Sequence, residues 1–300
     1  MVETPSTLPR ERVLVMGATG MLGHEVVSVF ADSYEVHATV RDPVAAQALG
    51  VRATLHPLDA FDMRPLRGLL EELAPRLIVN CVGVVKQLPE GSQSIPAITV
   101  NALFPHLVAA AAEEVGARLL HVSTDCVFSG NLPLGRAYSE EDLPDARDLY
   151  GRTKLLGEVD APALTLRTSI IGWELTRSNG LLGWFAAQRG ATVTGYTRAI
   201  FSGLTTQALA KILLDVAFGR PDLVGLYHVS SDPISKHDLL TMINERLELD
   251  VRITPVDDPV INRALDSSRF RADSRLEIPS WDRMLDAYFV RERSQRETHA

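Results

Sequence analysis

Short apolar segments alternate with helix-like segments over the first 170 residues, and this alternation is what most restricts the fold. The apolar segments stand at residues 12–16, 34–40, 52–56, 76–81, 118–123 and 163–167. Between them, apolar residues recur at helical spacing, most clearly over 21–30 and 101–115. Strands that alternate with helices form parallel βαβ units, and fully apolar strands indicate helices on both faces of the sheet. The sequence therefore predicts an α/β fold with a doubly wound parallel sheet, which binds its ligands beyond the carboxyl ends of the strands.

The composition excludes several classes of protein. The 300 residues carry a formal net charge of -8, so clustered basic side chains for a nucleic-acid partner are not expected. The two cysteines, Cys81 and Cys126, lie among apolar residues and predict buried thiols. His, Asp and Glu show no metal-ligand spacing. No signal-like stretch opens the chain, and no run approaches the ~18 apolar residues of a membrane span, so we expect a cytoplasmic protein without a membrane partner.

A glycine-rich loop joins the first predicted strand to the first predicted helix. Gly17, Gly20 and Gly23 are spaced G-x-x-G-x-x-G, in the strand-turn-helix context that a dinucleotide site requires. Such glycines allow a tight turn, close approach of a pyrophosphate and close packing of helix on strand. A purely structural turn is the alternative interpretation. The loop predicts a pyrophosphate site that also uses the remaining loop residues Thr19, Met21 and Leu22.

The end of the second predicted strand bears on the choice of nucleotide. A carboxylate there typically binds the ribose of NAD, whereas a cation binds the 2′-phosphate of NADP. Arg41 follows Val40 at this point, and Asp42 precedes Pro43, where it can cap the next helix. The pattern favours NADP(H) held by Arg41. NAD(H), with Arg41 as a solvated loop residue, is the alternative.

The segment "DLYGRTKLLGEV" places Tyr150 and Lys154 one helical turn apart, on the same face. In isolation this spacing describes two surface neighbours. However, Ser123 and Thr124 end the fifth predicted strand, and the Tyr150 helix follows it at the same edge of the sheet. The combination predicts that a hydroxyl, a phenol and an ammonium group meet where a nicotinamide would bind.

These features together resemble the extended short-chain dehydrogenase/reductase superfamily over residues 13–230. Within it, "GATGMLG", "STDCVFSG", "YGRTKLLGE", "LRTSIIGWE" and the later "LDSSRF" are similar to the dTDP-4-dehydrorhamnose reductase branch. The resemblance implies an NADP(H)-dependent reductase of a 4-keto-deoxysugar linked to a nucleoside diphosphate. In it Thr124 would hold the substrate oxygen and Tyr150 would donate the proton. Lys154 would lower the pKa of the phenol and bind the nicotinamide ribose.

The resemblance also implies further site residues. Those expected at the cofactor are Asp59, Cys81, Val82, Gly83 and Asn101, and those expected at the substrate are Val84, Lys86, Ser123, Trp173, Arg198 and Arg269. For Asp59 the alternative is a helix cap, for Lys86 a solvated side chain, and for Arg269 a surface ion pair. Cys126 stands where related dehydratases carry a glutamate, which favours plain reduction, with or without epimerisation.

The regular alternation loosens after Ile171. We predict loose tails at 1–11 and 293–300 and a Rossmann domain at 12–171, to which residues 200–230 return. A smaller substrate-binding domain would comprise 172–199 and 231–292. Two other functions stay open: a reductase or epimerase of another carbonyl, similar to the dihydroflavonol reductase branch, and a non-catalytic nucleotide-binding subunit. A homodimer also stays open.

Overall fold

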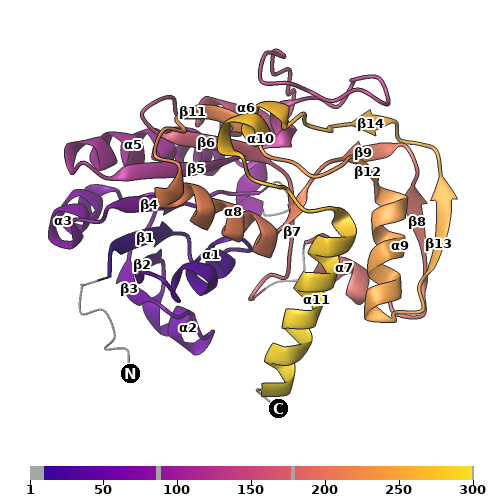
Figure 1. The fold of residues 1–300 in the computed structure, drawn as a ribbon, viewed down its shortest axis with the longest axis horizontal. Coiled ribbons are helices and arrows are strands. Elements are labelled where there is room, and N and C mark those ends of the chain that lie inside the picture. Colours follow the sequence, from indigo (N-terminus) through magenta and orange to yellow (C-terminus); the bar gives the residue numbers. More distant parts are fainter. Residues whose placement is uncertain (1–9, 86–88, 177–179, 299–300) are drawn as a thin grey trace, which may run out of the picture.

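The computed structural model describes residues 10–85, 89–176 and 180–298 (Figure 1). Seven strands form one parallel sheet in the order β11-β6-β5-β4-β1-β2-β3. Their bounds are β1 (Arg12–Met16), β2 (Glu35–Val40), β3 (Thr54–Pro57), β4 (Leu77–Asn80), β5 (Arg118–Thr124), β6 (Leu164–Thr168) and β11 (Gly225–His228). The chain changes direction across the sheet between β1 and β4, which is where doubly wound folds open a crevice for ligands. The predicted fold class is confirmed.

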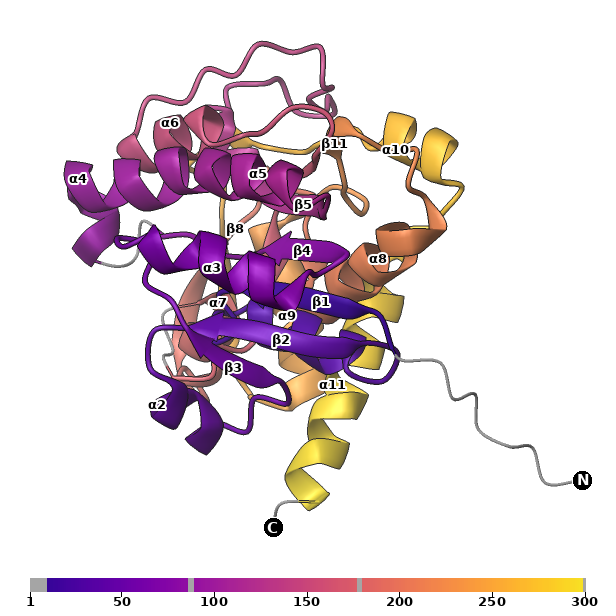
Figure 2. The same ribbon diagram turned by 90° about the vertical axis from the view of Figure 1, so that its left-hand side faces the viewer.

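Helices cover both faces of the sheet, and in Figure 2 the helices of one face lie in front of the strands. In β1, Val13 and Val15 face the core that includes α1 (Gly23–Phe30) and α8 (Thr206–Gly219). Leu14 and Met16 point the other way, toward α3 (Arg64–Leu73) and α5 (Phe104–Glu114). This alternation with period two explains why the strand is apolar on both faces.

The remaining elements form a second lobe, on the right of Figure 1. It contains a parallel pair, β8 (Thr192–Tyr196) and β13 (Arg252–Val256), a small sheet of β12 (Ile234–Ser235), β9 (Ala199–Phe201) and β14 (Ile261–Asn262), and the helices α7 (Leu181–Ala186) and α9 (Lys236–Leu247). Helix α10 (Ser268–Ser274) is the exception and packs beside β11 of the large sheet (Figure 1). The pair β7 (Ile170–Ile171) and β10 (Leu204–Thr205) connects it to the large sheet.

Helix α11 (Trp281–Thr298) binds the two lobes together (Figure 1). Arg291 donates to Glu25 Oε2 of α1 at 2.7 Å, while the Tyr288 hydroxyl accepts from the Trp173 amide at 2.8 Å. The expectation of a loose tail from 293 was wrong as far as Thr298, because the helix continues to that residue. Since one hydrophobic core joins strands of the sheet to Trp281 and Tyr288, the exact division into domains stays a prediction.

One described stretch, Ser94–Glu114, is long and apolar enough to cross a membrane, with a mean hydropathy of 1.6. It consists of α4 (Ser94–Ala97), a π-helix η2 (Ile98–Leu103) and α5, and 44% of its most apolar window is buried. The expectation that no run approaches this length was therefore too strong. Core helices of globular proteins meet the same criterion, and α5 packs on the large sheet through Phe104 and Val108.

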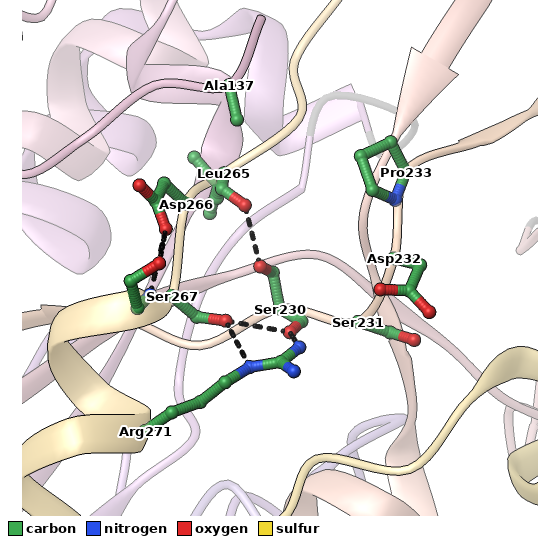
Figure 3. A pocket seen from close by; sticks show the side chains of 10 residues that line it. Ala137, Ser230, Ser231, Asp232, Pro233, Leu265, Asp266, Ser267 and Arg271 are labelled. Carbon is green, nitrogen blue, oxygen red and sulfur yellow. Dashed lines mark hydrogen bonds between the residues drawn. The ribbon is translucent and has the colours of Figure 1, made fainter. Parts of the chain in front are cut away.

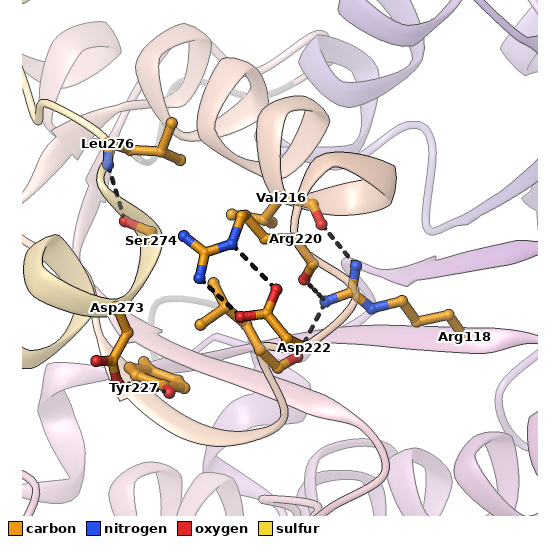
Figure 4. A network of polar contacts seen from close by, with 9 residues as sticks. Arg118, Val216, Arg220, Asp222, Tyr227, Asp273, Ser274 and Leu276 are labelled. Carbon is orange, nitrogen blue, oxygen red and sulfur yellow. Dashed lines mark hydrogen bonds and ion pairs between the residues drawn. The ribbon is translucent and has the colours of Figure 1, made fainter.

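Arg118, the first residue of β5, holds the end of α8 (Figure 4). Its guanidinium donates to the carbonyls of Val216, Ala217, Arg220 and Leu223 at 2.6, 2.5, 2.9 and 2.9 Å. A helix leaves its last carbonyls without partners, and a cation is favourable at that end of the dipole. One side chain thus satisfies the C-terminus of α8 and fixes this helix to the amino end of the sheet.

Candidate active site

The glycine loop has the geometry of a phosphate cradle. Gly17 follows β1 with φ +80, and its carbonyl accepts from the Gly20 amide at 3.0 Å. A Cβ on Gly23 would lie 2.1 Å from Gly17 O, so a side chain there is excluded by the backbone itself. The N-terminus of α1 opens directly onto this turn. The residues present therefore fit a dinucleotide pyrophosphate, which such a helix end binds through its amides and dipole.

Two neighbours support the loop from either side. Thr39 of β2 accepts from the Gly17 amide through its hydroxyl at 3.4 Å and from the Ala18 amide through its carbonyl at 3.3 Å. On the other side, a Cβ on Gly17 would meet the Val82 side chain at 3.1 Å. Val82 was expected here, whereas Thr39 was missed. A buried polar residue inside an apolar strand was the signal that could have found it.

Asn101 holds the segment that follows β4. It is fully buried in η2, where its Oδ1 accepts from the Val84 amide at 2.8 Å and its Nδ2 donates to the Val84 carbonyl at 2.9 Å. A π-helix inside an α-helix often marks a functional position. Cys81, Val82, Gly83 and Val84 are thus brought to the crevice as a group. Lys86 lies outside the described residues.

Helix α6 (Leu149–Leu156) carries Tyr150 and Lys154 to the end of β5. Asp148 caps it by accepting from the Gly151 amide at 2.8 Å. A Cβ on Gly151 would lie 2.2 Å from Cys126 O, so the helix begins in direct contact with the short helix η3 (Asp125–Val127). At the other end, a Cβ on Gly157 would lie 1.9 Å from Asn101 O. These two glycines were missed, although their spacing around the Tyr-Lys pair was visible.

The phenol of Tyr150 lies beside the side chain of Thr124, which acts on the pKa of the phenol. Burial raises the pKa of Tyr150 above its ordinary value, further raised by neighbouring Cys126 and only partly offset by Thr124. That Lys154 lowers the pKa of the phenol stays a prediction. The ammonium donates to the Val122 carbonyl at 2.9 Å, and desolvation dominates. Tyr150 is therefore protonated at neutral pH.

Lys154 is itself strongly buried, with 5% of the residue exposed. Burial lowers the pKa of its ammonium to about 8, while Glu158 and Cys81 act in the opposite direction. The group is therefore largely charged at neutral pH and loses its charge just above it.

Comparison with known proteins identifies the family. Residues 11–293 match the family described as the RmlD substrate binding domain. The chain belongs to this family. Methionine adenosyltransferase 2 subunit beta of Rattus norvegicus is 34% identical over 158 residues, which are 53% of this chain and 45% of that protein. The dTDP-4-dehydrorhamnose reductase of Streptomyces griseus is 37% identical over 153 residues, 51% of this chain and 45% of that one. The chain thus spans about half the length of these curated relatives.

The fold of this RmlD-family chain is also that of solved structures. The dTDP-4-dehydrorhamnose reductase of Bacillus anthracis, solved in complex with NADP, superposes with a TM-score of 0.78 over 94% of this chain and 99% of that one, at 23% identity. At this identity the likeness shows the fold alone.

The RmlD-family chain places its predicted nucleotide-selecting residues at the β2–α2 turn. Arg41 is exposed directly after β2. Asp42 caps α2 (Pro43–Ala48), since its Oδ1 accepts from the amides of Val44 and Ala45 at 3.0 and 3.1 Å. Asp59 accepts from the Phe61 amide at 3.0 Å, which makes a local turn; the first helical position of α3 follows Met63, so Asp59 is no cap of that helix.

Four predicted substrate residues have the following positions in the structure, and their roles stay predictions. Ser123, on the opposite side of β5, donates to Glu158 at 2.7 Å. Trp173 follows β7 and is held through its amide by α11. Arg198 is exposed in the turn between β8 and β9. Arg269 on α10 hydrogen-bonds Leu226 O, and its guanidinium lies 4.6 Å from the centre of the Tyr227 ring and 3.7 Å from Glu140.

A charged group next to Thr124 was also missed. Asp125 is 5% exposed, and burial raises the pKa of its carboxyl, while Arg263 and Lys236 of the second lobe lower it. Lys236 Nζ lies 3.8 Å from the centre of the Phe201 ring. The Asp in "STDCVF" was the available signal for this group. The effect of Arg263 and Lys236 on Asp125 shows that the second lobe presents cations toward the carboxyl end of β5.

A separate pocket of about 240 Å³ lies between α10 and the segment after β11 (Figure 3). Arg271 projects into it and donates to Ser267 Oγ at 3.2 Å and Ser230 O at 3.1 Å. The buried serine hydroxyls around it donate to protein carbonyls: Ser230 to Leu265, Ser231 to Pro279 and Ser267 to Ser230. The pocket is thus held by internal hydrogen bonds.

Proposed function

We propose that this RmlD-family chain is an NADP(H)-dependent reductase of a 4-keto-deoxysugar linked to a nucleoside diphosphate. The observation that carries the proposal is the protonated Tyr150 phenol beside Thr124, one helical turn from the charged Lys154. These groups stand at the carboxyl end of β5, two strands from the glycine loop after β1. The relatives named dTDP-4-dehydrorhamnose reductase and dTDP-4-keto-6-deoxy-D-glucose reductase support the substrate class.

Thr124, Tyr150 and Lys154 would have different roles in the reduction of a ketone. The reaction needs a hydride at the carbonyl carbon, which a bound nicotinamide supplies, and a proton at the oxygen. Thr124 would hold that oxygen by a hydrogen bond while Tyr150 donates the proton, leaving an alcohol and a phenolate. Lys154 would stabilise the phenolate and contact the cofactor ribose. Lys154 is buried, which strengthens its electrostatic interactions.

Cofactor choice would rest on Arg41. Because Asp42 is engaged in capping α2, its carboxylate is directed to amides of that helix. Arg41, exposed at the adjacent position, can pair with a 2′-phosphate through charge-assisted hydrogen bonds. The solved Bacillus anthracis reductase, which holds NADP, is consistent with this choice.

The test is NADPH oxidation against a panel of nucleotide-linked 4-keto sugars, with the product alcohol identified by mass spectrometry. We expect turnover with at least one panel member, and we expect Tyr150→Phe to abolish it. Wild-type protein that binds NADPH but reduces no member of the panel would contradict the proposal.

A second candidate is a non-catalytic subunit of another enzyme, which the relatives named methionine adenosyltransferase 2 subunit beta favour. Retention of Thr124, Tyr150 and Lys154 in one connected site favours the reductase. A chain that binds NADPH, lacks turnover and alters the activity of a methionine adenosyltransferase would favour the subunit instead.

A further inference from the structure

A buried ion pair lies directly behind the Tyr-Lys helix. Glu158 follows α6 by two residues, and its side chain is 12% exposed, while that of Arg167 on β6 is 4% exposed. Glu158 Oε1 accepts from Arg167 Nε and from Ser123 Oγ, both at 2.7 Å, and Oε2 accepts from Arg167 Nη2 at 2.7 Å. The carboxylate therefore has three donors from two strands and a single orientation.

His228 of β11 completes the support of Arg167. Its Nδ1 lies 3.0 Å from the Tyr138 carbonyl, which can only accept, so Nδ1 carries the proton. Its Nε2 is then a lone-pair acceptor for Arg167 Nη1 at 3.3 Å. Burial, reinforced by Arg167, lowers the pKa of His228 to about 4, so the ring is neutral at physiological pH. The network thus contains one negative and one positive charge, each fully hydrogen-bonded.

Stability alone is a poor explanation for Glu158. A carboxylate just past a helix C-terminus faces the negative end of the dipole. A buried ion pair also repays its desolvation cost at best approximately, and apolar replacements are often as stable. What the position does provide is a fixed negative charge four residues from Lys154, just beyond the end of α6.

We infer that Glu158 is a positioning residue, the fixed counter-charge that keeps the Lys154 ammonium protonated and directed to the end of β5. Strand β5 hydrogen-bonds both Lys154 and Glu158, because Val122 O accepts from Lys154 and the next residue, Ser123, donates to Glu158. Glu158 also opposes the effect of burial on the pKa of Lys154. The other titratable groups that interact with Lys154 are Cys81 after β4 and His121 on β5. The catalytic consequence of this inference rests on the proposed reductase function.

The chain allows a direct measurement that needs no turnover, because it has only four lysines, Lys86, Lys154, Lys211 and Lys236. Protein labelled with [ε-¹³C]lysine gives four signals to follow by NMR during a pH titration, and Lys154→Arg assigns one of them. We expect the Lys154 midpoint of the wild type near its pKa of about 8. Glu158→Gln should lower this midpoint by about one pH unit or more, since a like-sized neutral group replaces the counter-charge.

Glu140→Gln is the matched control. Glu140 is also a buried carboxylate next to His228, accepting from the His228 amide at 2.7 Å, but it does not act on Lys154. If Glu158→Gln unfolds the chain because Arg167 is left unpaired, Glu158→Gln/Arg167→Gln is titrated against Arg167→Gln alone, so that the two proteins differ only in the charge at residue 158. An unchanged Lys154 midpoint, or an equal fall in Glu140→Gln, would overturn the inference.

Turnover is measured separately. If the reductase proposal holds, the high-pH limb of the kcat profile should move down with the Lys154 midpoint in Glu158→Gln, whereas a purely structural role would lower kcat at all pH values alike. A wild type without any turnover would remove the proposed function and leave the NMR titration as a valid test of the counter-charge.

Discussion

The burial of Lys154 should appear as a pH-dependent term in the stability of the protein. Its pKa is about 8 in the folded chain and 10.5 for the ordinary side chain. Below pH 8 both the folded and the unfolded chain hold the proton, and charging Lys154 within the fold then costs about 3 kcal/mol, at ~1.36 kcal/mol per pH unit. Between about pH 8 and 10.5 the unfolded chain binds more protons, so this contribution makes the free energy of unfolding rise with pH. The penalty is gone above 10.5.

Lys154→Met removes the titrating group and with it this dependence. The free energy of unfolding of the wild type, taken relative to Lys154→Met, should therefore increase by about 2 kcal/mol between about pH 7 and 9.5. Urea unfolding followed by circular dichroism at several pH values measures the difference. Lys211→Met, which removes an exposed lysine on α8, is the control and should show no such slope. A wild-type-minus-mutant difference that stays flat across this range would refute the argument that Lys154 is buried in its charged form.

Three further changes test other parts of the structure. Tyr150→Phe should abolish turnover while the Kd for NADPH stays within a few-fold of wild type, because the ring still packs; fluorescence titration and kinetics separate the two effects. Arg41→Ala should weaken NADPH binding by roughly tenfold to a hundredfold and leave NADH unchanged, about 1.5–3 kcal/mol for one charge-assisted contact; equal losses for both cofactors would count against a 2′-phosphate contact. Gly157→Ala should lower the free energy of unfolding by about 2 kcal/mol or more in a denaturation assay, because the added Cβ would lie 1.9 Å from Asn101 O. Gly68→Ala in α3 is the control; nothing lies within 4 Å of its added Cβ, so this change should be neutral or stabilising in the same assay.

The large sheet was predictable from the sequence because its signal is local. Apolar runs bounded by turns located all six predicted strands of the first 170 residues, and the glycine loop followed from spacing. The short strand pairs outside the large sheet, such as β7 with β10, have two residues in each strand, which is too few to show a hydrophobic periodicity. The same holds for the C-terminal helix, whose last turns are as polar as a loose tail.

The electrostatics of the site could not be read from spacing. A Tyr and a Lys one turn apart suggested that the ammonium lowers the pKa of the phenol, but the direction depends on burial, which only the packed fold supplies. Arg269 illustrates the limit for substrate residues: an arginine in a resembling motif was a reasonable candidate, yet α10 places it against β11. Ser123 donates to Glu158, and neighbouring strand residues point to opposite faces, so its side chain is directed away from that of Thr124.

Gly151 and Gly157 have a consequence for how this chain can diversify. Each brings α6 into main-chain contact at one end, on η3 and on η2, so the rotation of the helix about its own axis is set by backbone atoms. The orientation of Tyr150 and Lys154 is then set by these backbone contacts and does not depend on the side chains around the crevice. Substitutions elsewhere around the crevice can accordingly accumulate without turning the helix, whereas a side chain at either glycine would displace Tyr150 and Lys154 together.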